Sequence, residues 1–376
     1  MSKTDYKRLG DYIREVDVRN KDLEVKELLG VSISKEFIPS IANTIGTDMS
    51  FYKVVGSWQF AYGPVTSRNG DKVSIALYTG KEKIIISQAY TVFEVKKQQE
   101  LLPKYLMMWF RRPEFDRYAR FKSHGSAREI FSWEEMCDVI LPIPPIEQQR
   151  KIVAEYETIS RRIRLNKQII IRLEETAQTL YRKMFVDEID KENLPKGWRI
   201  GTLGEIAEYV NDKISLEDIE DIDYISTENM LKDKKGIIYS TNKPDNGRGT
   251  KFKREDILVS NIRPYFKKIW KASFDGACSN DVLCFRSKDK NNTLLLFYIM
   301  EQDCFFDYIM AGSNGVKMPR GDKDWIMKYP ILKPPKKDIE QFQMKTYTLY
   351  KCIINYKQEK LQMRKIQSLL MARIGQ

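Results

Sequence analysis

The sequence predicts an α+β protein in which two homologous globules are separated by two long helices that pack on each other as an antiparallel coiled coil. Three observations support this fold. The chain repeats its own motifs in order, one segment carries a long heptad pattern, and a related pattern ends the chain. A chain of 376 residues is long enough for two domains of ordinary size and connecting helix. We expect globules at residues 1–146 and 191–337, a helix with its linker at 147–190, and a second helix at 338–376.

The internal duplication is clearest at two proline-rich segments that each open into a helical pattern. Pro142–Gln149 has the sequence PIPPIEQQ, and Pro330–Gln341 contains PILKPP followed by IEQ. Further pairs of segments occur in the same order, namely Leu9-Gly10-Asp11 with Leu203-Gly204-Glu205, Ser87–Phe93 with Ser279–Phe285, and Gly125-Ser126 with Gly312-Ser313. Their shared order and near-constant offset argue against chance, so the predicted order is globule, helix, globule, helix.

Each globule shows a mixture of strand and helix patterns. Lys83–Val95 and Asp256–Lys271 are rich in β-branched and aromatic residues and are bounded by turn formers, which predicts strands. Leu101–Phe110 and Thr293–Asp307 predict short amphipathic helices. The polar, acidic stretch Val186–Asn193 predicts a linker into the second globule.

The first long helix is predicted from Glu147 to about Phe185, because apolar residues keep a strict 4-3 spacing there. The seam consists of Ile152, Tyr156, Ile159, Ile163, Asn166, Ile170, Leu173, Ala177, Leu180 and Met184. A heptad seam sustained over this length is typical of a coiled coil. Asn166 is its only polar member, and the sequence leaves open whether it is a buried residue that fixes the register or an exposed one.

The C-terminal segment carries a related seam through Leu349, Tyr356, Met363 and Leu370. The positions between them fit two registers, one with Ile353, Lys360 and Ile374, the other with Cys352 and Ile366. Each apolar stripe is too narrow to be buried in the core of one globule, so we expect the two helices to pack on each other. Helices of ~38 residues would span about 57 Å and would hold the globules a fixed distance apart.

The charge balance favours a polyanionic partner. The chain has 64 Lys and Arg against 52 Asp and Glu, a formal net charge of +12, which points to nucleic acid or to an anionic membrane surface. No apolar run approaches the ~20 residues of a spanning helix, and the first residues have no apolar stretch of the signal-peptide kind. We therefore expect a cytoplasmic protein, from a bacterium or archaeon, that binds nucleic acid and no membrane.

Several kinds of catalytic chemistry have no counterpart in the sequence. The five cysteines are scattered without a C-x-x-C pair and are expected to be free thiols, and a single histidine, His124, cannot build a zinc site on His ligands. The glycine-rich loop and Asn/Asp-Pro-Pro-aromatic site of a methyltransferase are missing, as is a Walker-type phosphate loop. We expect no catalytic residues, no metal ligands and no cofactor bound by this chain.

Loops in corresponding regions of both repeats mix basic, amide, hydroxyl and aromatic side chains around glycines, as DNA recognition requires. Any one of these residues alone is better explained as a solvated charge or a half-buried aromatic. Collectively we predict DNA contacts, in the first globule by Trp58, Gln59, Tyr62, Arg68, Lys122, Ser123, His124, Ser126 and Arg128. In the second globule the predicted contacts are Asn246, Arg248, Lys251, Lys253, Asn261, Arg263, Tyr265, Lys267, Ser313, Asn314, Lys317 and Arg320.

These motifs resemble the specificity subunits of type I restriction–modification enzymes over essentially the whole chain. The resemblance rests on the domain order, on the strand exit into Pro-x-Pro-Pro-Ile-Glu-Gln-Gln, and on the helix ending near Leu180–Phe185. The opening of the second globule, Leu194–Trp198 followed by Leu203–Ile206, and the segment Asp256–Ser260 are also similar to that family.

The resemblance implies that each globule is a target-recognition domain for one half of a bipartite double-stranded DNA site. The helices would set the spacer and dock two methyltransferase subunits, which bring S-adenosylmethionine. Separate restriction/translocase subunits would use ATP and Mg. This chain departs from the pattern in having three extra residues before its second Glu-Gln and in lacking the Leu-Pro-x-Gly-Trp lead-in at its first globule.

Two other classes of function compete with this interpretation. A basic coiled-coil scaffold would bind any duplex with similar affinity, whereas a specificity subunit would bind one sequence. A nuclease with a disguised acidic site, such as Glu217–Asp223, would cleave DNA by itself in a metal-dependent way, although a solvated acidic face explains that stretch better.

Overall fold

The chain forms two compact units. The computed structural model describes residues 6–40, 46–67, 69–70, 72–124, 129–187, 189–190, 192–239 and 242–375. One unit comprises residues 1–165 and 360–376, and the other comprises 166–359. Each long helix contributes one part to each unit, so each unit contains one globule and one part of the helix pair.

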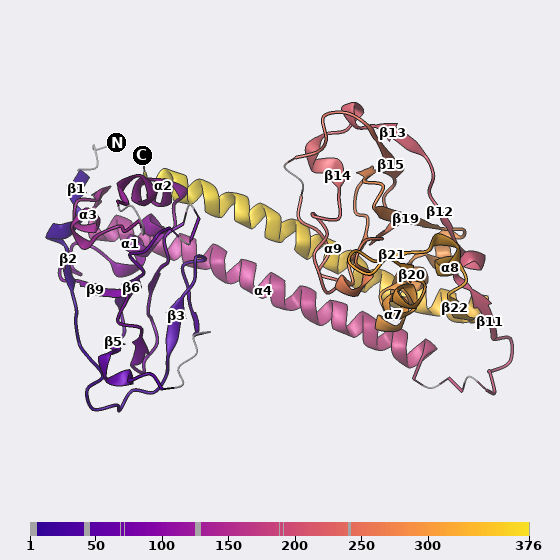
Figure 1. Ribbon diagram of the computed structural model, residues 1–376, viewed down its shortest axis with the longest axis horizontal. Helices are drawn as coiled ribbons and strands as arrows, with labels where there is room; N and C mark the ends of the chain where they lie inside the picture. Colours follow the sequence, from indigo (N-terminus) through magenta and orange to yellow (C-terminus); the bar gives the residue numbers. More distant parts are fainter. Residues whose placement is uncertain are drawn as a thin grey trace. The chain divides into compact units, whose positions relative to one another are not determined.

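The first globule is built on a four-stranded antiparallel sheet of order β2-β9-β6-β7, with smaller two-stranded sheets around it (Figure 1). Its strands are β1 (Tyr6–Arg8), β2 (Ile13–Glu15), β3 (Leu29–Val31), β4 (Phe37–Pro39), β5 (Lys53–Val55), β6 (Gln59–Tyr62), β7 (Ile75–Leu77), β8 (Ile84–Ile86), β9 (Thr91–Val95) and β10 (Ile140–Pro142). The helices α1 (Pro103–Phe110), α2 (Pro113–Lys122) and α3 (Trp133–Cys137) precede the long helix α4 (Ile146–Phe185). Phe60 and Phe93 stack at 4.8 Å between ring centroids and form the centre of the core.

The second globule contains two four-stranded sheets, of order β12-β19-β16-β17 and β13-β15-β18-β14. Its strands are β11 (Arg199–Thr202), β12 (Ala207–Tyr209), β13 (Lys213–Ser215), β14 (Tyr224–Ile225), β15 (Arg248–Phe252), β16 (Ile257–Ser260), β17 (Ile269–Lys271), β18 (Gly276–Cys278), β19 (Val282–Ser287), β20 (Ser313–Asn314), β21 (Arg320–Gly321) and β22 (Pro330–Lys333). Helices α5 (Leu203–Ile206), α6 (Thr293–Met300), α7 (Asp303–Ala311) and α8 (Lys323–Met327) precede the long helix α9 (Lys336–Arg373).

The predicted duplication is present in the topology. The sheet β2-β9-β6-β7 corresponds strand by strand to β12-β19-β16-β17, and the edge pair β1-β10 corresponds to β11-β22. The predicted strands in Lys83–Val95 and Asp256–Lys271 are confirmed, as is the predicted helix in Leu101–Phe110. The prediction of one helix over Thr293–Asp307 is wrong in detail, because the chain turns at Glu301-Gln302 and forms α6 and α7 instead.

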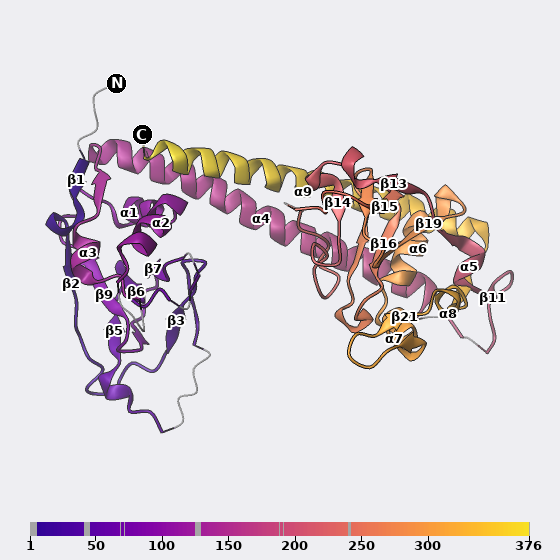
Figure 2. The same cartoon turned by 45° about the horizontal axis from the view of Figure 1, so that its top comes forward.

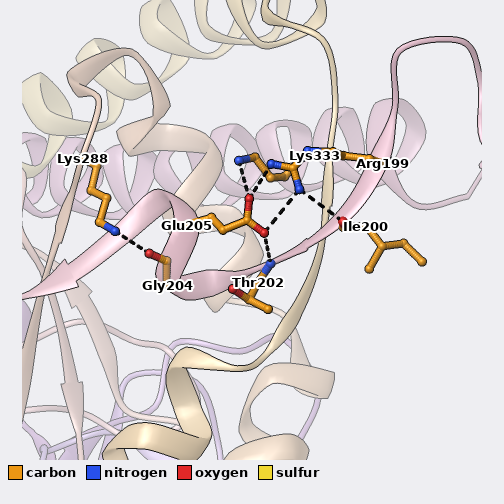
Figure 3. Close-up of polar contacts among 7 residues, drawn as sticks. All are labelled: Arg199, Ile200, Thr202, Gly204, Glu205, Lys288 and Lys333. Carbon is orange, nitrogen blue, oxygen red and sulfur yellow. Dashed lines mark hydrogen bonds and ion pairs between the residues drawn. The ribbon is translucent and has the colours of Figure 1, made fainter.

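The paired motifs Leu9-Gly10-Asp11 and Leu203-Gly204-Glu205 make the same contacts in both repeats. The amide of Leu9 donates to the Val139 carbonyl at 2.8 Å, and that of Leu203 donates to Tyr329 at 2.9 Å. A lysine ammonium also caps each glycine carbonyl, Lys96 on Gly10 at 3.2 Å and Lys288 on Gly204 at 2.5 Å (Figure 3). The motif therefore joins the edge of each globule to its central sheet.

Glu205 adds a polar cluster to the second copy of this motif (Figure 3). Its carboxylate accepts hydrogen bonds from the Arg199 guanidinium, from Lys333 Nζ at 2.9 Å and from the Thr202 amide at 2.9 Å. The bond from Arg199, followed by that from Lys333, lowers the pKa of Glu205 to about 2. Because Arg199 and Lys333 are also partners in the β11–β22 pair, the cluster closes the two ends of the second globule against each other.

Every seam position predicted on α4 is buried or partly buried, which agrees with the heptad pattern. Asn166 is completely buried, so the alternative that it is exposed is wrong. Neither atom of its side-chain amide has a hydrogen-bond partner among the described residues. A role in fixing the register stays a prediction.

The seam of α9 follows the first of the two possible registers. Leu349, Tyr356, Met363 and Leu370 are all partly buried. Ile353 is 5% exposed, whereas Ile366 of the other register is 45% exposed. The second register fits less well because Ile366 is exposed, although Cys352 is partly buried.

The two long helices are antiparallel in both units, and Figures 1 and 2 show them side by side. In the first unit Gln367 Nε2 donates to Ser160 Oγ at 2.8 Å, and in the second unit Lys357 Nζ donates to Glu174 Oε1 at 2.8 Å. Within the second unit, the partner number on α9 falls from 357 to 342 as the position on α4 rises from 174 to 185, as an antiparallel pair requires.

The proline motifs set the start of both long helices. Helix α4 begins at Ile146 and α9 begins at Lys336, directly after Pro145 and Pro335. The three extra residues before the second Glu-Gln therefore lie in the first turn of α9. Gln149 is completely buried, accepts from the Leu102 amide at 2.9 Å and donates to the Glu100 and Pro144 carbonyls at 2.7 and 2.8 Å. This glutamine thus attaches α4 to the segment before α1.

No helix within the described ranges combines the length and the apolar character that a membrane span requires.

Candidate nucleic-acid interface

In the first globule, the loop after β6 pairs with the segment after α2. Val65 and Ile130 form an antiparallel bridge, and the Thr66 amide donates to the Glu129 carbonyl at 2.9 Å. The Thr66 hydroxyl also donates to Ser123 Oγ at 2.9 Å. The fold thereby brings together two of the loops that the sequence predicted to contact DNA.

The second globule repeats this arrangement with the loop after β16 and the segment after α7. Ile262 bridges Arg320, the Arg263 amide donates to Pro319 at 2.8 Å, and the Gly321 amide donates to Asn261 at 3.3 Å. The predicted segments 261–268 and 313–320 are therefore adjacent. The same pair of loops therefore lies at corresponding places in both repeats.

Three predicted residues of the first globule lie on this loop pair. Lys122 Nζ and His124 Nε2 lie 3.3 and 3.9 Å from the carboxylate of Glu135, and the His124 side chain is 75% exposed. Ser123 donates to the Ala119 carbonyl at 2.7 Å, so its hydroxyl is held in place. The predicted contacts Arg68, Ser126 and Arg128 lie outside the described residues.

The remaining predicted contacts of the first globule do not belong to the loop pair. Tyr62 is completely buried against Phe93, so its prediction as a DNA contact is corrected to a core residue. Gln59 lies at the opposite end of β6 from the loop. Its side-chain oxygen accepts from the Gly56 amide at 2.7 Å, and its Nε2 atom donates to Glu94 at 3.0 Å. Trp58 precedes β6, and its ring lies 5.5 Å from the ammonium of Lys104.

In the second globule, a single 3-10 turn at Pro264–Phe266 presents an aromatic ring to solvent. The turn is flanked by Arg263 and Lys267, whose φ angles of 51° and 50° lie in the left-handed region. Tyr265 is 48% exposed, and Lys267 Nζ lies 3.0 Å from Asp303 Oδ1. The turn thus places an exposed aromatic ring between two basic residues.

The hairpin β20–β21 lies beside this turn. Asn314 and Lys317 are exposed, and Ser313 donates to the Met310 carbonyl at 2.8 Å. Arg320 lies 3.1 Å from Asp281 Oδ1, so its guanidinium is oriented by an acidic neighbour. Asn261, at the base of the hairpin, has a buried side-chain oxygen without a hydrogen-bond partner among the described residues.

Strand β15 and its flanks provide a second group of predicted residues. Arg248 and Lys251 are exposed along the strand, and Asn246 and Lys253 are exposed beside it. The buried residues of the same strand, such as Phe252, pack into a separate small core. Arg248 and Lys251 are three positions apart, so they lie on opposite faces of the strand, and both are exposed.

The fold connects these two groups through residues that the sequence analysis did not select. Lys213 of β13 donates to Asn280 at 2.7 Å and to Thr250 of β15 at 2.9 Å. Asn280 is the neighbour of Asp281, which binds Arg320 of the hairpin. No local pattern in the sequence brings 213, 280 and 320 together, so only the folded chain identifies this cluster.

A lysine cluster extends the surface on the other side of the 3-10 turn. The Asp233 and Lys234 amides donate to the Phe266 and Lys267 carbonyls, both at 2.9 Å. Lys232 Nζ lies 4.0 Å from the centroid of the Phe266 ring. Burial, followed by repulsion from Lys232, lowers the pKa of Lys268. Crowded ammonium groups of this kind are suited to phosphate oxygens.

A buried carboxyl group, Glu301, makes the second unit sensitive to pH. Its Oε2 atom is buried without a partner among the described residues. Burial is the main cause that raises the pKa of Glu301 to about 7. The hydrogen bond from Gln178 and the ammonium groups of Lys234 and Lys357 lower this pKa. The neighbouring carboxylate of Glu174 raises it. The folded state therefore favours the protonated acid.

We expect the contribution of Glu301 to stability to be full below its ordinary pKa of 4.5 and to be lost as the pH rises through about 7. The loss can reach about 3 kcal/mol. Glu301→Gln should remove this pH dependence and raise the free energy of unfolding at pH 8. Urea unfolding of both proteins at pH 5 and pH 8 measures the difference, and an identical pH dependence would refute the assignment.

Comparison with known proteins agrees with this architecture. A family model described as type I restriction modification DNA specificity domain matches residues 7–175. The type I restriction enzyme EcoDI specificity subunit of Escherichia coli is 22% identical over 318 residues, which cover 75% of this chain and 69% of that protein. The crystal structure of the S subunit of a type I restriction–modification system from M. genitalium covers 100% of this chain and 97% of its own, with a TM-score of 0.60 and 12% identity.

The structural likeness supports the fold, and the family model identifies the domain in residues 7–175. They also agree with the predicted α+β architecture, in which two globules accompany a pair of long helices. By this match, residues 7–175 of the chain carry the DNA specificity domain of type I restriction–modification systems.

Proposed function

We propose that each globule recognises one half of a bipartite double-stranded DNA site through its loop pair. The observation that carries this proposal is the repeated pairing of the post-β6 and post-β16 loops with the segments after α2 and α7. Surfaces built twice by one chain are suited to two half-sites, and the net charge of +12 supports binding to phosphates. Within each loop pair, Ser123, Asn261, Asn314 and Arg320 would contact bases, and the lysines would contact phosphates.

We also propose that α4 and α9 bind two methyltransferase subunits. Large apolar side chains are exposed on the helices, including Leu165 and Ile171 on α4 and Met344, Leu361 and Leu369 on α9. Exposed apolar groups gathered on a helix pair are typical of a surface that a protein partner covers. The partners would supply S-adenosylmethionine, and restriction subunits with ATP and Mg would complete the complex.

The test of the function is a methylation map of DNA from cells that express the methyltransferase with and without this chain. The proposal predicts a split motif that appears only with the chain. Methylation that does not depend on the chain would instead favour a basic coiled-coil scaffold. Cleavage of DNA by the purified chain with metal ions would favour a nuclease.

We further propose that the length of the helix pair sets the spacer between the half-sites. Because Glu174 and Lys357 are partners, seven residues inserted after each would keep both seams in register. The insertion adds about 10 Å of helix, close to 3 base pairs of B-DNA. We expect the mapped motif to keep both halves and to gain about 3 unspecified base pairs between them.

The control for this prediction carries the same seven residues in the linker, between Asn193 and Leu194, where they lengthen no helix. Its motif should be unchanged. An unchanged motif in the helix-insertion variant as well would refute the role of the helices in setting the spacer.

A further inference from the structure

We propose that the tip of the β20–β21 hairpin, residues Gly315–Met318, is an apolar wedge that enters a groove of the bound duplex and partly unstacks one base step. The inference rests on the proposed DNA-recognition function and adds a deformation of the DNA to it. The tip carries two apolar side chains that the protein leaves in water. Val316 is fully exposed and Met318 is 49% exposed.

The stem of the hairpin is fixed on the globule. Ser313 pairs with Gly321 and Asn314 pairs with Arg320, and the Ile262–Arg320 bridge attaches the hairpin to the loop after β16. Gly321 allows close packing, because a Cβ atom there would meet Ile309 Cγ2 at 2.7 Å. A fixed stem holds the two apolar side chains outward and lowers the entropy that is lost when they insert into a ligand.

The turn itself is built to present Val316. Gly315 adopts a φ of 94°, a conformation that residues with a Cβ rarely adopt, and this turns the chain directly before Val316. Pro319 is buried, and its carbonyl accepts from the Arg263 amide, which fixes the return of the chain. Both ends of the tip are thus anchored, while its apolar middle is not.

The charges beside the tip favour nucleic acid as its occupant. Lys317 lies between the two apolar residues, and Arg320 lies on the adjacent strand, where it pairs with Asp281 at 3.1 Å. Cations beside an exposed apolar tip match a DNA groove, in which phosphates line both walls and the base stack is apolar. Insertion of such a wedge unstacks a step and bends the duplex toward the major groove.

The wedge would give the second globule a specificity that needs no hydrogen bond to a base. Pyrimidine–purine steps unstack most easily, so a protein that inserts a wedge favours them at the inserted position. We therefore expect one flexible step in the half-site that the second globule recognises.

The experiment uses the full chain assembled with its methyltransferase subunits on a duplex that carries the mapped target. Each adenine of the second half-site, on either strand, is replaced in turn by its analogue 2-aminopurine, whose fluorescence rises when stacking is lost. We expect a rise at one step in the native complex, and its loss to the level of free duplex in the double variant Val316→Ser, Met318→Ser. The matched control Ile238→Ser, at another exposed apolar residue, should keep the rise.

Binding measured by fluorescence anisotropy separates this inference from the proposed function. Selective binding without a 2-aminopurine rise at any step overturns the wedge alone. A rise that the double variant retains belongs to the methyltransferase and also overturns the wedge. Equal binding to target and unrelated duplexes overturns both proposals.

Discussion

Replacement of Asp116 by alanine is expected to lower the free energy of unfolding of the first unit by about 3–5 kcal/mol, because it leaves a buried ammonium group without its counter-ion. Lys35 is 5% exposed, and its Nζ lies 2.7 Å from Asp116 Oδ1 and donates to the Phe110 carbonyl. Asp116 also accepts from the Val73 amide at 3.0 Å. Burial lowers the pKa of Lys35, because removing the charged ammonium group from water is unfavourable.

Hydrogen–deuterium exchange on the full chain provides the measurement, because it reports the two units separately. The variant should lose protection around β3–β4, α2 and β7, with α6 and α7 unchanged. The double variant Lys35→Met, Asp116→Leu removes both charges and should regain most of the protection. If the single variant were as protected as the native chain, the buried pair would not stabilise the first globule.

Phe342→Ala is expected to destabilise the second unit by about 3–5 kcal/mol, since it opens a cavity where both long helices meet the globule. Phe342 of α9 is completely buried. Its ring centroid lies 5.1 Å from that of Phe185 and 6.1 Å from that of Tyr181, both on α4, and 5.7 Å from that of Tyr298 on α6. Loss of this ring therefore weakens three contacts together.

The matched control for Phe342→Ala is Met344→Ala, two residues further along α9 and 72% exposed. It should change the free energy of unfolding by less than about 0.5 kcal/mol. Urea unfolding followed by tryptophan fluorescence compares the variants, because Trp198 lies 5.8 Å from Phe185, centroid to centroid, in the same cluster. Equal effects of the two substitutions would contradict the assignment of Phe342 to the core.

The architecture could be predicted from sequence where a single pattern repeats over many residues. The 4-3 spacing of α4 selects positions that are all buried or partly buried, because each position is defined by those before and after it. On α9 the pattern alone was ambiguous, since both Ile366 and Gln367 lie near the expected position. The structure selects Gln367, whose amide bonds to Ser160, and exposes Ile366. A polar residue at a seam position cannot be recognised without its partner.

The candidate site was predicted in part. Composition identified the loops at 261–268 and 313–320, which the fold brings together. Tyr62 was misassigned because the turn residues Gly63 and Pro64 follow it directly and suggested a loop. It lies instead on β6, a central strand of its sheet, and is completely buried. Lys213 and Asn280 were missed because their contact joins residues 67 positions apart. Side-chain placement of this kind depends on tertiary pairing, which local sequence does not encode.

Exchange of the second globule tests most directly whether each globule recognises its own half-site. Arg199 and Lys333 are paired in the β11–β22 ladder, so residues 199–333 can be replaced by those of another specificity subunit at two adjoining points. The methylation motif of the hybrid, mapped in cells that express the same methyltransferase, should keep one half and the spacer and change the other half. A motif that changed in both halves, or in neither, would contradict recognition of one half-site by each globule.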